Sequence, residues 1–464
     1  MSDGDVSMQA FRVVLVVLSF TIITFFFLSL TPDGPGAAAS SGPPQSVFTS
    51  ASAQASKVMV IPATARKVTE YSLPPDLYKK AHDLGRIYFR LSLIGFVYGL
   101  IVLWLILHRK LAPKYRDWAE RSSANRFLQT LLFSPPLLLT IAGLTLPLDV
   151  YSETVAKRFG LSVQGWRAWS WDWVKAEMIQ LVIGTLLIWL LYGMIRRSPR
   201  HWWVYSWLIS LPIGVFLFFI QPWVIDPVFY TFEPLQHKDP TLTAALERMV
   251  QRAGETIPPE RIFWMGASEK TTALNAYVTG IGASKRIVVW DTTIAKMNTP
   301  QIVFITGHEM GHYVLQHILK GLTFFASLLL LLFYLGYCSV NWVLARWAMG
   351  WEIRSLDDWA SLPVLLFLLS FFLFLASPVS NAFSRHLEHQ ADQYGLEVTH
   401  GLTPDSGQQA AQAFQVLGEV DLADPNPNPI NVFLYYDHPS ISNRIRFSLT
   451  YDPWSKGGQG EFVK

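Results

Sequence analysis

The stretch Gly307-His308-Glu309-Met310-Gly311-His312 determines which fold and chemistry we expect of this chain of 464 residues. In an α-helix, a spacing of four residues places His308 and His312 on one face, one turn apart, where two neutral imidazoles can hold a zinc ion. Glu309 lies about 100° around the helix and can accept a proton from a water molecule on that ion. The motif therefore predicts a zinc site with Glu309 as general base.

The residues around the motif predict its helix independently. Thr299 is the expected N-cap and Pro300 the first helical residue, and no Gly or Pro follows before Gly307. If the helix continued, His317 would lie on the face opposite His308, which excludes it as a ligand. The only cysteine, Cys338, excludes an internal disulfide and a thiolate cluster, so the remaining ligands are expected to be His or carboxylate side chains.

The composition is that of a mainly α-helical, polytopic membrane protein. Hydrophobic residues make up 51% and charged residues 15% of the chain, and the mean hydropathy is +0.27. These values are too apolar for an ordinary soluble enzyme. The net charge is only +3, and no stripe of Lys and Arg alternates with aromatic residues. We therefore expect a lipid bilayer as partner and no nucleic acid.

Residues 1–30 contain the first predicted membrane helix, because the apolar run 11–30 is long enough to cross a bilayer. A cleaved signal peptide is the alternative. We favour an uncleaved helix that serves as an anchor, because the run is longer than the usual apolar region of a signal peptide and Asp3 and Asp5 precede it. Residues 31–70 begin with a segment rich in Ala, Ser, Pro and Gly and are expected to be a flexible linker.

Further apolar runs bring the expected number of membrane helices to about seven. They lie at residues 91–107, 127–148, 178–195, 203–221, 321–344 and 360–380. The rest of the chain then divides into membrane helices two to five in 71–221, a first soluble part in 222–320, membrane helices six and seven in 321–383, and a second soluble part in 384–464. Together the two soluble parts are expected to form an α+β, zincin-like metallopeptidase domain.

The first soluble part contains two segments rich in β-branched and aromatic residues, 275–280 and 286–293. They predict a hairpin that leads into the helix of the motif. Beside a peptidase centre, an exposed edge strand can pair with the backbone of an extended substrate. The alternative is an ordinary hairpin that only packs against the helix.

The second soluble part must complete the metal site. Residues 384–392 are polar and helical in character, with Glu388 and Asp392 on one face. Glu388 is the expected third ligand, and Asp392 is expected to orient a metal-bound imidazole. By residue type alone, His386 and His389 are rivals for the ligand position.

These motifs resemble those of the type I CAAX prenyl endopeptidases. That family consists of integral-membrane zinc metalloproteases of the gluzincin kind, which cleave after a prenylated cysteine near a protein's C-terminus. The resemblance extends over about residues 75–450. It is carried by Asn275-Ala-Tyr, by the motif at 308–312, by Ser384-Arg-x-x-Glu388-x-Gln-Ala-Asp392, by Pro425-Asn-Pro-Asn-Pro429, and by His438-Pro-Ser with Arg444.

The resemblance implies a barrel of seven membrane helices around a water-filled chamber, capped by the zinc domain. It assigns one zinc ion per chain to His308, His312 and Glu388, and the role of base to Glu309. It also implies that the strand with Asn275, Ala276 and Tyr277 binds the substrate.

For His438 the resemblance implies contacts with the transition state, where it would donate to the oxyanion of the tetrahedral intermediate. Without the resemblance, His438 would be an ordinary surface histidine beside a proline. Arg385 and Arg444 are expected to support the site. Arg444 could add positive potential or brace the helix of the third ligand through Asp392, and both interpretations remain open.

Two classes of function are compatible with the sequence. The first is a zinc endopeptidase acting on a peptide or protein substrate. It would be either a CAAX-type enzyme acting on lipidated C-termini or a general quality-control protease of membrane proteins. The second is a transporter or scaffold with a vestigial zinc domain. The intact motif favours the first class.

The sequence gives two conflicting indications of the side on which the zinc domain lies. Lys and Arg crowd the loops after the second and fourth membrane helices, so the positive-inside rule places these loops in the cytoplasm and the zinc domain outside. The resemblance implies a cytosolic zinc domain. The cations concerned are Arg109, Lys110, Lys114, Arg116, Arg121, Arg126, Arg196, Arg197 and Arg200.

Overall fold

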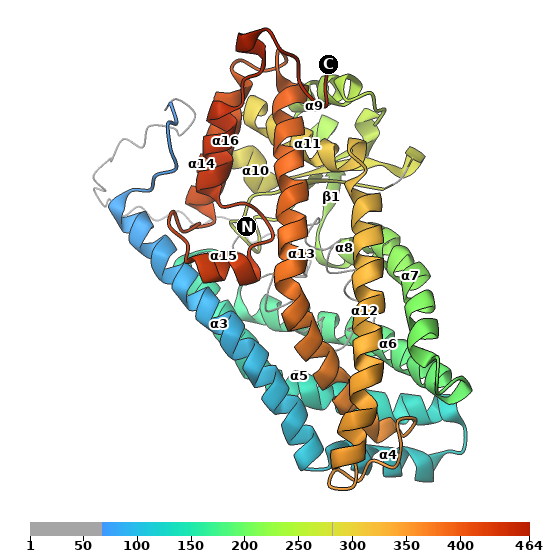
Figure 1. The fold of residues 1–464 in the computed structure, drawn as a ribbon. Coiled ribbons are helices and arrows are strands. Elements are labelled where there is room, and N and C mark those ends of the chain that lie inside the picture. The colour runs from blue at the N-terminus through green and yellow to red at the C-terminus, as the bar shows by residue number, and fades with distance from the viewer. Residues whose placement is uncertain (1–66, 281) are drawn as a thin grey trace, which may run out of the picture.

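The computed structural model of the protein describes residues 67–280 and 282–464. The membrane helix predicted at 1–30 and nearly all of the linker predicted at 31–70 therefore lie outside the described residues. In the described part, long helices form one half of the molecule, and shorter helices around a small sheet form the other (Figure 1).

By length and composition, five of the described helices can cross a bilayer. They are α3 (Pro75–His108), α5 (Arg126–Phe159), α6 (Trp166–Arg197), α12 (His317–Trp347) and α13 (Leu362–Thr399). A sixth candidate span is a pair of segments bent by 42°, formed by α7 (Trp202–Ile220) and by the π-helical turn Gln221–Ile225 with α8 (Asp226–Phe229). The bend coincides with Pro222, which cannot donate to the helical ladder. Five of the six runs predicted after residue 71 thus lie on helices long and apolar enough to span a bilayer, and the sixth, 203–221, lies in the bent pair.

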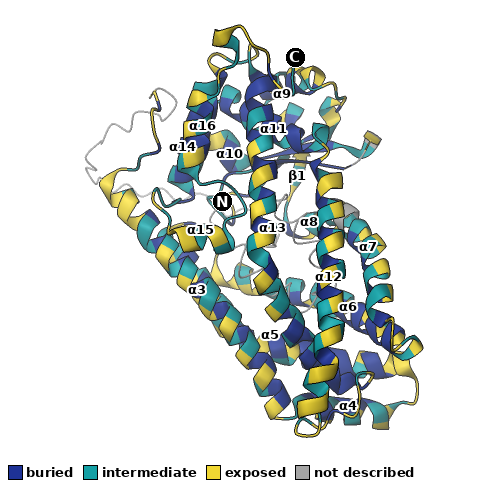
Figure 2. Ribbon diagram, in the orientation of Figure 1, coloured by how far each residue is buried: buried dark blue, intermediate teal, exposed yellow. Residues whose placement is uncertain are grey.

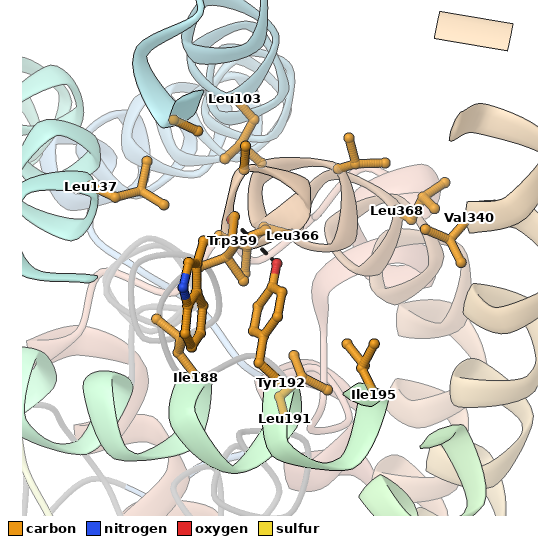
Figure 3. Close-up of a cluster of buried hydrophobic side chains, with 14 of the residues drawn as sticks. Leu103, Leu137, Ile188, Leu191, Tyr192, Ile195, Val340, Trp359, Leu366 and Leu368 are labelled. Atoms are coloured by element: carbon orange, nitrogen blue, oxygen red, sulfur yellow. Dashed lines mark hydrogen bonds between the residues drawn. The ribbon is translucent and has the colours of Figure 1, made fainter. Parts of the chain in front are cut away.

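A buried apolar cluster holds the membrane helices together and extends to α4 (Leu111–Ser122), which joins α3 to α5; Figure 3 shows the part of it around Tyr192 and Trp359. Trp359 is fully buried there, with its ring centroid 4.7 Å from that of Tyr192. The hydroxyl oxygen of Tyr192 lies 2.7 Å from Ser361 Oγ. Arg116 on α4 is also buried, and its Nη1 lies 2.6 Å from Asp358 Oδ2, so its charge is paired as a buried charge must be.

The soluble half is built on a four-stranded sheet in the order β1-β2-β4-β3. The strands are β1 (Phe232–Pro234), β2 (Ile262–Met265), β3 (Ala276–Thr279) and β4 (Arg286–Trp290). β3 pairs antiparallel with β4 and lies at the edge of the sheet, so the predicted hairpin and edge strand are confirmed. The surrounding helices are α9 (Pro240–Arg252), α10 (Asp291–Lys296), α11 (Thr299–Val314), α14 (Ser406–Val420), α15 (Pro429–Tyr435) and α16 (Ile441–Thr450).

α11 carries the histidine motif and begins one residue earlier than expected. Its N-cap is Asn298, not Thr299. Asn298 Oδ1 accepts from the Gln301 N–H at 3.0 Å, and Gln301 Oε1 accepts from the Asn298 N–H at 3.0 Å. This reciprocal capping box satisfies two N–H groups at once, which Thr299 could not do with the residue three positions on, Ile302.

Glycines allow α11 and α13 to lie close together. A Cβ atom at Gly307 would come within 2.9 Å of Val398 Cγ1, and one at Gly395 within 3.1 Å of His308 N. Side chains at these positions would push the two helices apart. The glycine before the first histidine is therefore part of what brings the histidines to α13.

α13 connects the membrane half with the soluble half. It runs without a break from Leu362, at the α4 end, to Thr399, beside α11 (Figure 1). Exposed residues line its outer face and that of α3 (Figure 2), and among them are large apolar side chains, as on a membrane-spanning surface. We call four of these residues the lipid-facing belt: Ile94, Val97, Leu375 and Val379.

Candidate metal and catalytic site

Three buried side chains converge where α11 meets α13. His308, His312 and Glu388 each offer one ligand atom, and these atoms all lie within 4.8 Å of one another. Nε2 of His308 is 3.2 Å from Glu388 Oε2, and Nε2 of His312 is 3.4 Å from Glu388 Oε1. The sequence-predicted ligand set is therefore brought together.

The ring nitrogens of both histidines that face away from this point already have partners. Nδ1 of His308 lies 2.9 Å from Asp392 Oδ1, and Nδ1 of His312 lies 3.1 Å from Nδ1 of His317. Both Nε2 atoms are therefore directed at the carboxylate of Glu388, which is buried between them. Two imidazole nitrogens and one carboxylate oxygen are a donor set that suits zinc, with a coordination position left for water or substrate.

The two imidazoles differ in their attraction for protons. Burial lowers the pKa of His308, but the hydrogen bonds to Asp392 and Glu388 outweigh burial and raise the pKa to about 10. Burial lowers the pKa of His312 to about 3. A metal ion at this site must therefore displace a proton from His308, whereas His312 is already neutral.

Arg444 on α16 holds Asp392 in place. Its Nε and Nη2 donate to the two carboxylate oxygens of Asp392 at 2.9 and 2.6 Å, and its guanidinium stacks 4.2 Å from the ring of Phe414. Nη2 is also 3.9 Å from Glu388 Oε2. Of the two interpretations left open by the sequence, this geometry matches the brace through Asp392, and the proximity to Glu388 adds positive potential as well.

His317 contacts a predicted ligand, which the sequence did not indicate. α11 ends at Val314 and α12 begins at His317, after Gln316 adopts a left-handed conformation with φ of 58°. The chain therefore turns, and His317 lies behind His312 rather than on the far side of one continuous helix. Its Nε2 lies 3.1 Å from Gln390 Oε1 on α13, which fixes its ring. No glycine or proline marks this turn, so it could not be predicted from the residues at this position.

Glu309 and His438 approach the metal-binding side chains from the open side. A carboxylate oxygen of Glu309 is 4.0 Å from His308 Nε2. Burial raises the pKa of Glu309 to about 7, with His308 acting in the opposite direction. Nε2 of His438 lies 3.2 Å from Glu388 Oε2, and its Nδ1 lies 2.7 Å from Asp437 Oδ1.

The charges around His438 favour its protonated form. Burial lowers the pKa of this imidazole, but the charges of Glu388 and Asp437 outweigh burial and raise the pKa to about 9. Asp437 was not among the residues predicted to act in the site, although it directly precedes His438. The signal that could have identified it is a carboxylate adjacent in sequence to a candidate catalytic histidine.

Arg385 supports the loop before His438 rather than the metal-binding side chains. Its Nη1 donates to the carbonyl oxygens of Val432, at 3.2 Å, and of Tyr436. Asn381, one turn earlier on α13, donates to the carbonyl oxygen of Leu434 at 2.7 Å. These contacts attach α15 to α13 just before the chain reaches His438.

The rival histidines lie away from this point. His386 and His389 are exposed, and neither belongs to the converging group. The ring of His389 packs against Phe447, with the centroids 4.3 Å apart.

A cavity with a volume of about 150 Å³ joins the catalytic side chains to the membrane half. His308, Glu309 and His438 line one part of it. The other walls come from α3, α14, α15 and the β3 region, and include Leu84, Tyr88, Phe89, Leu417, Tyr435 and Asn275.

The edge strand β3 borders this cavity at one end. Asn275 lines the cavity, and its Nδ2 has no hydrogen-bond partner among the described residues. The N–H of Trp290 donates to the carbonyl oxygen of Asn275 at 3.0 Å. Because bonded residues alternate along an antiparallel pair, the N–H and C=O of Ala276 point to the free edge. The side chain of Tyr277 does not reach the site. It packs with Val288 and Trp290 on the face of the sheet opposite α11.

Comparisons with known proteins agree with this geometry. Residues 236–450 match the family model of peptidase family M48, and residues 55–231 match the model described as CAAX prenyl protease N-terminal, five membrane helices. The chain is 37% identical over 356 residues to the uncharacterized metalloprotease YhfN of Bacillus subtilis, which covers 77% of this chain and 82% of that protein.

More distant similarities cover most of the chain. It is 26% identical to CAAX prenyl protease 1 of Saccharomyces cerevisiae, over 82% of this chain and 89% of that protein. The crystal structure of S. mikatae Ste24p has the same fold, with a TM-score of 0.69 and 21% identity over 96% of this chain and 98% of that chain. The chain therefore belongs to peptidase family M48, in its CAAX prenyl protease group, and is an integral-membrane metalloendopeptidase.

Proposed function

We propose that this metalloendopeptidase holds one zinc ion per chain through His308, His312 and Glu388. The observation that carries the proposal is the convergence of the two Nε2 atoms on the buried carboxylate of Glu388, at 3.2 and 3.4 Å from its two oxygens. When bound, zinc would polarise the scissile carbonyl group and acidify a water molecule. The chain's own residues then supply the proton transfers and the substrate contacts.

Glu309 acts as the general base. Its carboxylate lines the cavity beside His308. Its pKa of about 7 is close to neutral pH, so the same group can accept a proton in one step and donate it in the next. Glu309 takes the proton of the attacking water molecule. It then returns that proton to the nitrogen of the departing amine.

His438 donates a hydrogen bond to the oxyanion that develops during the attack. The charges of Glu388 and Asp437 keep its imidazole protonated at neutral pH. Asp437 holds its Nδ1, so that the N–H at Nε2 is directed towards the metal-binding side chains. A donor placed in this way contributes about 3 kcal/mol to transition-state stabilisation.

The free edge of β3 holds the substrate in an extended conformation. The N–H and C=O of Ala276 are available for pairing with a peptide backbone, and Asn275 Nδ2 can donate to a substrate carbonyl oxygen. The scissile bond then lies along the strand, between β3 and the motif helix.

The substrate class that we propose is a polypeptide with a lipidated C-terminus, as the name of the yeast relative suggests for that protein. The feature of this chain that favours it is the wall of the cavity on α3, where Leu84, Tyr88 and Phe89 place apolar surface near Glu309. The alternative is a general quality-control protease of membrane proteins, which would cleave apolar segments without lipid.

Mass spectrometry of cleavage products distinguishes these substrate classes. Matched peptides with and without a farnesylated cysteine are incubated with the full chain in lipid vesicles, and Glu309→Gln serves as the inactive control. We expect cleavage near the modified cysteine and a clear preference for the farnesylated peptide. Equal cleavage of both peptides would favour the quality-control alternative.

A further inference from the structure

α15 forms a wall between the catalytic cavity and the outside of the molecule. On one face, Asn431 and Tyr435 line the cavity. On the other face, Ile430 and Phe433 are 60% and 58% exposed, although both are large and apolar. α15 itself contains no charged residue.

α15 packs at the level where the lipid-facing belt ends. The carbonyl oxygen of Leu434 accepts hydrogen bonds from Asn381 and Ser377 on α13, so α15 lies at the same level along α13 as Val379 of the belt, which is on another face of that helix. On the other side, the ring of Tyr435 meets that of Phe89 on α3, with the centroids 6.1 Å apart. Figure 1 shows α15 between α3 and α13, and Figure 2 shows its exposed surface.

The charges on α3 indicate the depth of α15 relative to a membrane. Arg86 and Arg90 flank Phe89 and are exposed, whereas the next exposed residues further along α3, from Ile94 onwards, are apolar. Cations at the end of an apolar belt lie at the level of lipid headgroups. α15 packs at the level of Phe89, so Ile430 and Phe433 face the boundary between headgroups and acyl chains, where amphipathic helices bind.

We propose that α15 is an interfacial helix whose Ile430 and Phe433 insert into the bilayer, so that lipid holds the catalytic loop in place. α15 ends at Tyr435, three residues before His438, and Arg385 ties its last turn to α13. A shift of α15 therefore displaces the imidazole of His438. This consequence rests on the role proposed above for His438, whereas the insertion into lipid does not.

Spin labels test the insertion directly. The full chain with Cys338→Ser receives a nitroxide at Ile430→Cys or Phe433→Cys and is reconstituted in phosphatidylcholine vesicles. Val379→Cys provides the lipid reference and Gly457→Cys the aqueous reference. We expect oxygen, which concentrates in lipid, to accelerate the spin relaxation of both labels on α15 as strongly as at Val379. A water-soluble nickel chelate should have little effect on either label. Access to the chelate equal to that at Gly457, or dipolar broadening from a second copy of the chain, would overturn the proposal.

Kinetics test the coupling to the catalytic loop. With a water-soluble peptide, Phe433→Ser should lower kcat by about tenfold, because a small displacement of a catalytic group has effects of this size or larger. KM and bound zinc should not change. Leu331→Ser, on the exposed face of α12, is the matched control and should leave kcat unchanged. An unchanged kcat in Phe433→Ser would refute the coupling. If the labels show insertion but His438→Ala is fully active, the role of His438 is refuted and the insertion of α15 into lipid stands.

Discussion

Replacing Asp437 by Asn should move the alkaline limit of activity to lower pH. His438 donates a hydrogen bond only while it is protonated, and its raised pKa of about 9 preserves this form up to that pH, so activity falls as the pH rises through 9. The carboxylate of Asp437 lies 2.7 Å from His438 Nδ1. Loss of an opposite charge at such a distance lowers the pKa by about one unit or more.

The size of the effect follows from the fraction of protonated His438. At pH 9 about half of the side chains are protonated in the parent and about one-tenth in Asp437→Asn, whereas at pH 7 both proteins are almost fully protonated. The variant should therefore have about one-fifth of the parent kcat at pH 9 and nearly the same kcat at pH 7. A bound metal ion would draw on the charge of Glu388 and lower the pKa of His438 in both proteins, so both alkaline limits would move below pH 9 while the difference between them remains. The ratio of about one-fifth then applies at the midpoint of the parent's own alkaline limit.

The assay is the kcat for a water-soluble fluorogenic peptide between about pH 6 and about pH 10, with zinc content measured at each end. Asp437→Glu, which keeps the charge, is the control and should retain more of the alkaline activity. Superimposable pH profiles of parent and Asp437→Asn, with zinc still bound, would show that His438 does not act as a protonated donor.

Three further predictions follow from the site and from the arrangement of the chain in the membrane. Glu388→Ala should lose bound zinc, whereas His386→Ala and His389→Ala should keep it, and a metal analysis with the reverse pattern would reassign the third ligand. Arg444→Met should lower the free energy of unfolding by about 3 kcal/mol in denaturant titrations, because it leaves Asp392 charged and buried. Adding Asp392→Asn should restore part of this loss, and simple additivity would contradict the pairing. The cationic loops lie at the α4 end, opposite the soluble half (Figure 1). The positive-inside rule therefore predicts that Gly457→Cys, with Cys338→Ser, is labelled by an impermeant thiol reagent outside intact cells, and protection would place the zinc domain in the cytosol.

The convergence of the predicted ligands could be expected from the sequence because it depends on helical periodicity. The spacing of His308 and His312, and that of Glu388 and Asp392, places each pair on one helix face, and apolar run length marks the membrane helices. Family membership decides in favour of an enzyme over a transporter or scaffold with a vestigial domain.

Contacts that depend on turns could not be predicted. The left-handed conformation of Gln316 brings His317 behind His312, yet this position carries neither Gly nor Asn, the residues that favour such a conformation. The start of α11 was predicted with Thr299 as its N-cap, but Asn298 and Gln301 cap the helix together. Likewise, the mostly apolar sequence of α15 does not indicate that one face of this short helix borders the cavity and the other lies at the surface.

Zinc content and turnover of Glu309→Gln, measured in the same preparation, are the sharpest test of the proposed hydrolysis. The substitution removes the proton acceptor and leaves all three metal-binding side chains in place. We expect one zinc ion per chain, as in the parent, with kcat lower by a factor of about a hundred or more. Near-normal peptide hydrolysis by this zinc-loaded variant would contradict the assignment of Glu309 as general base.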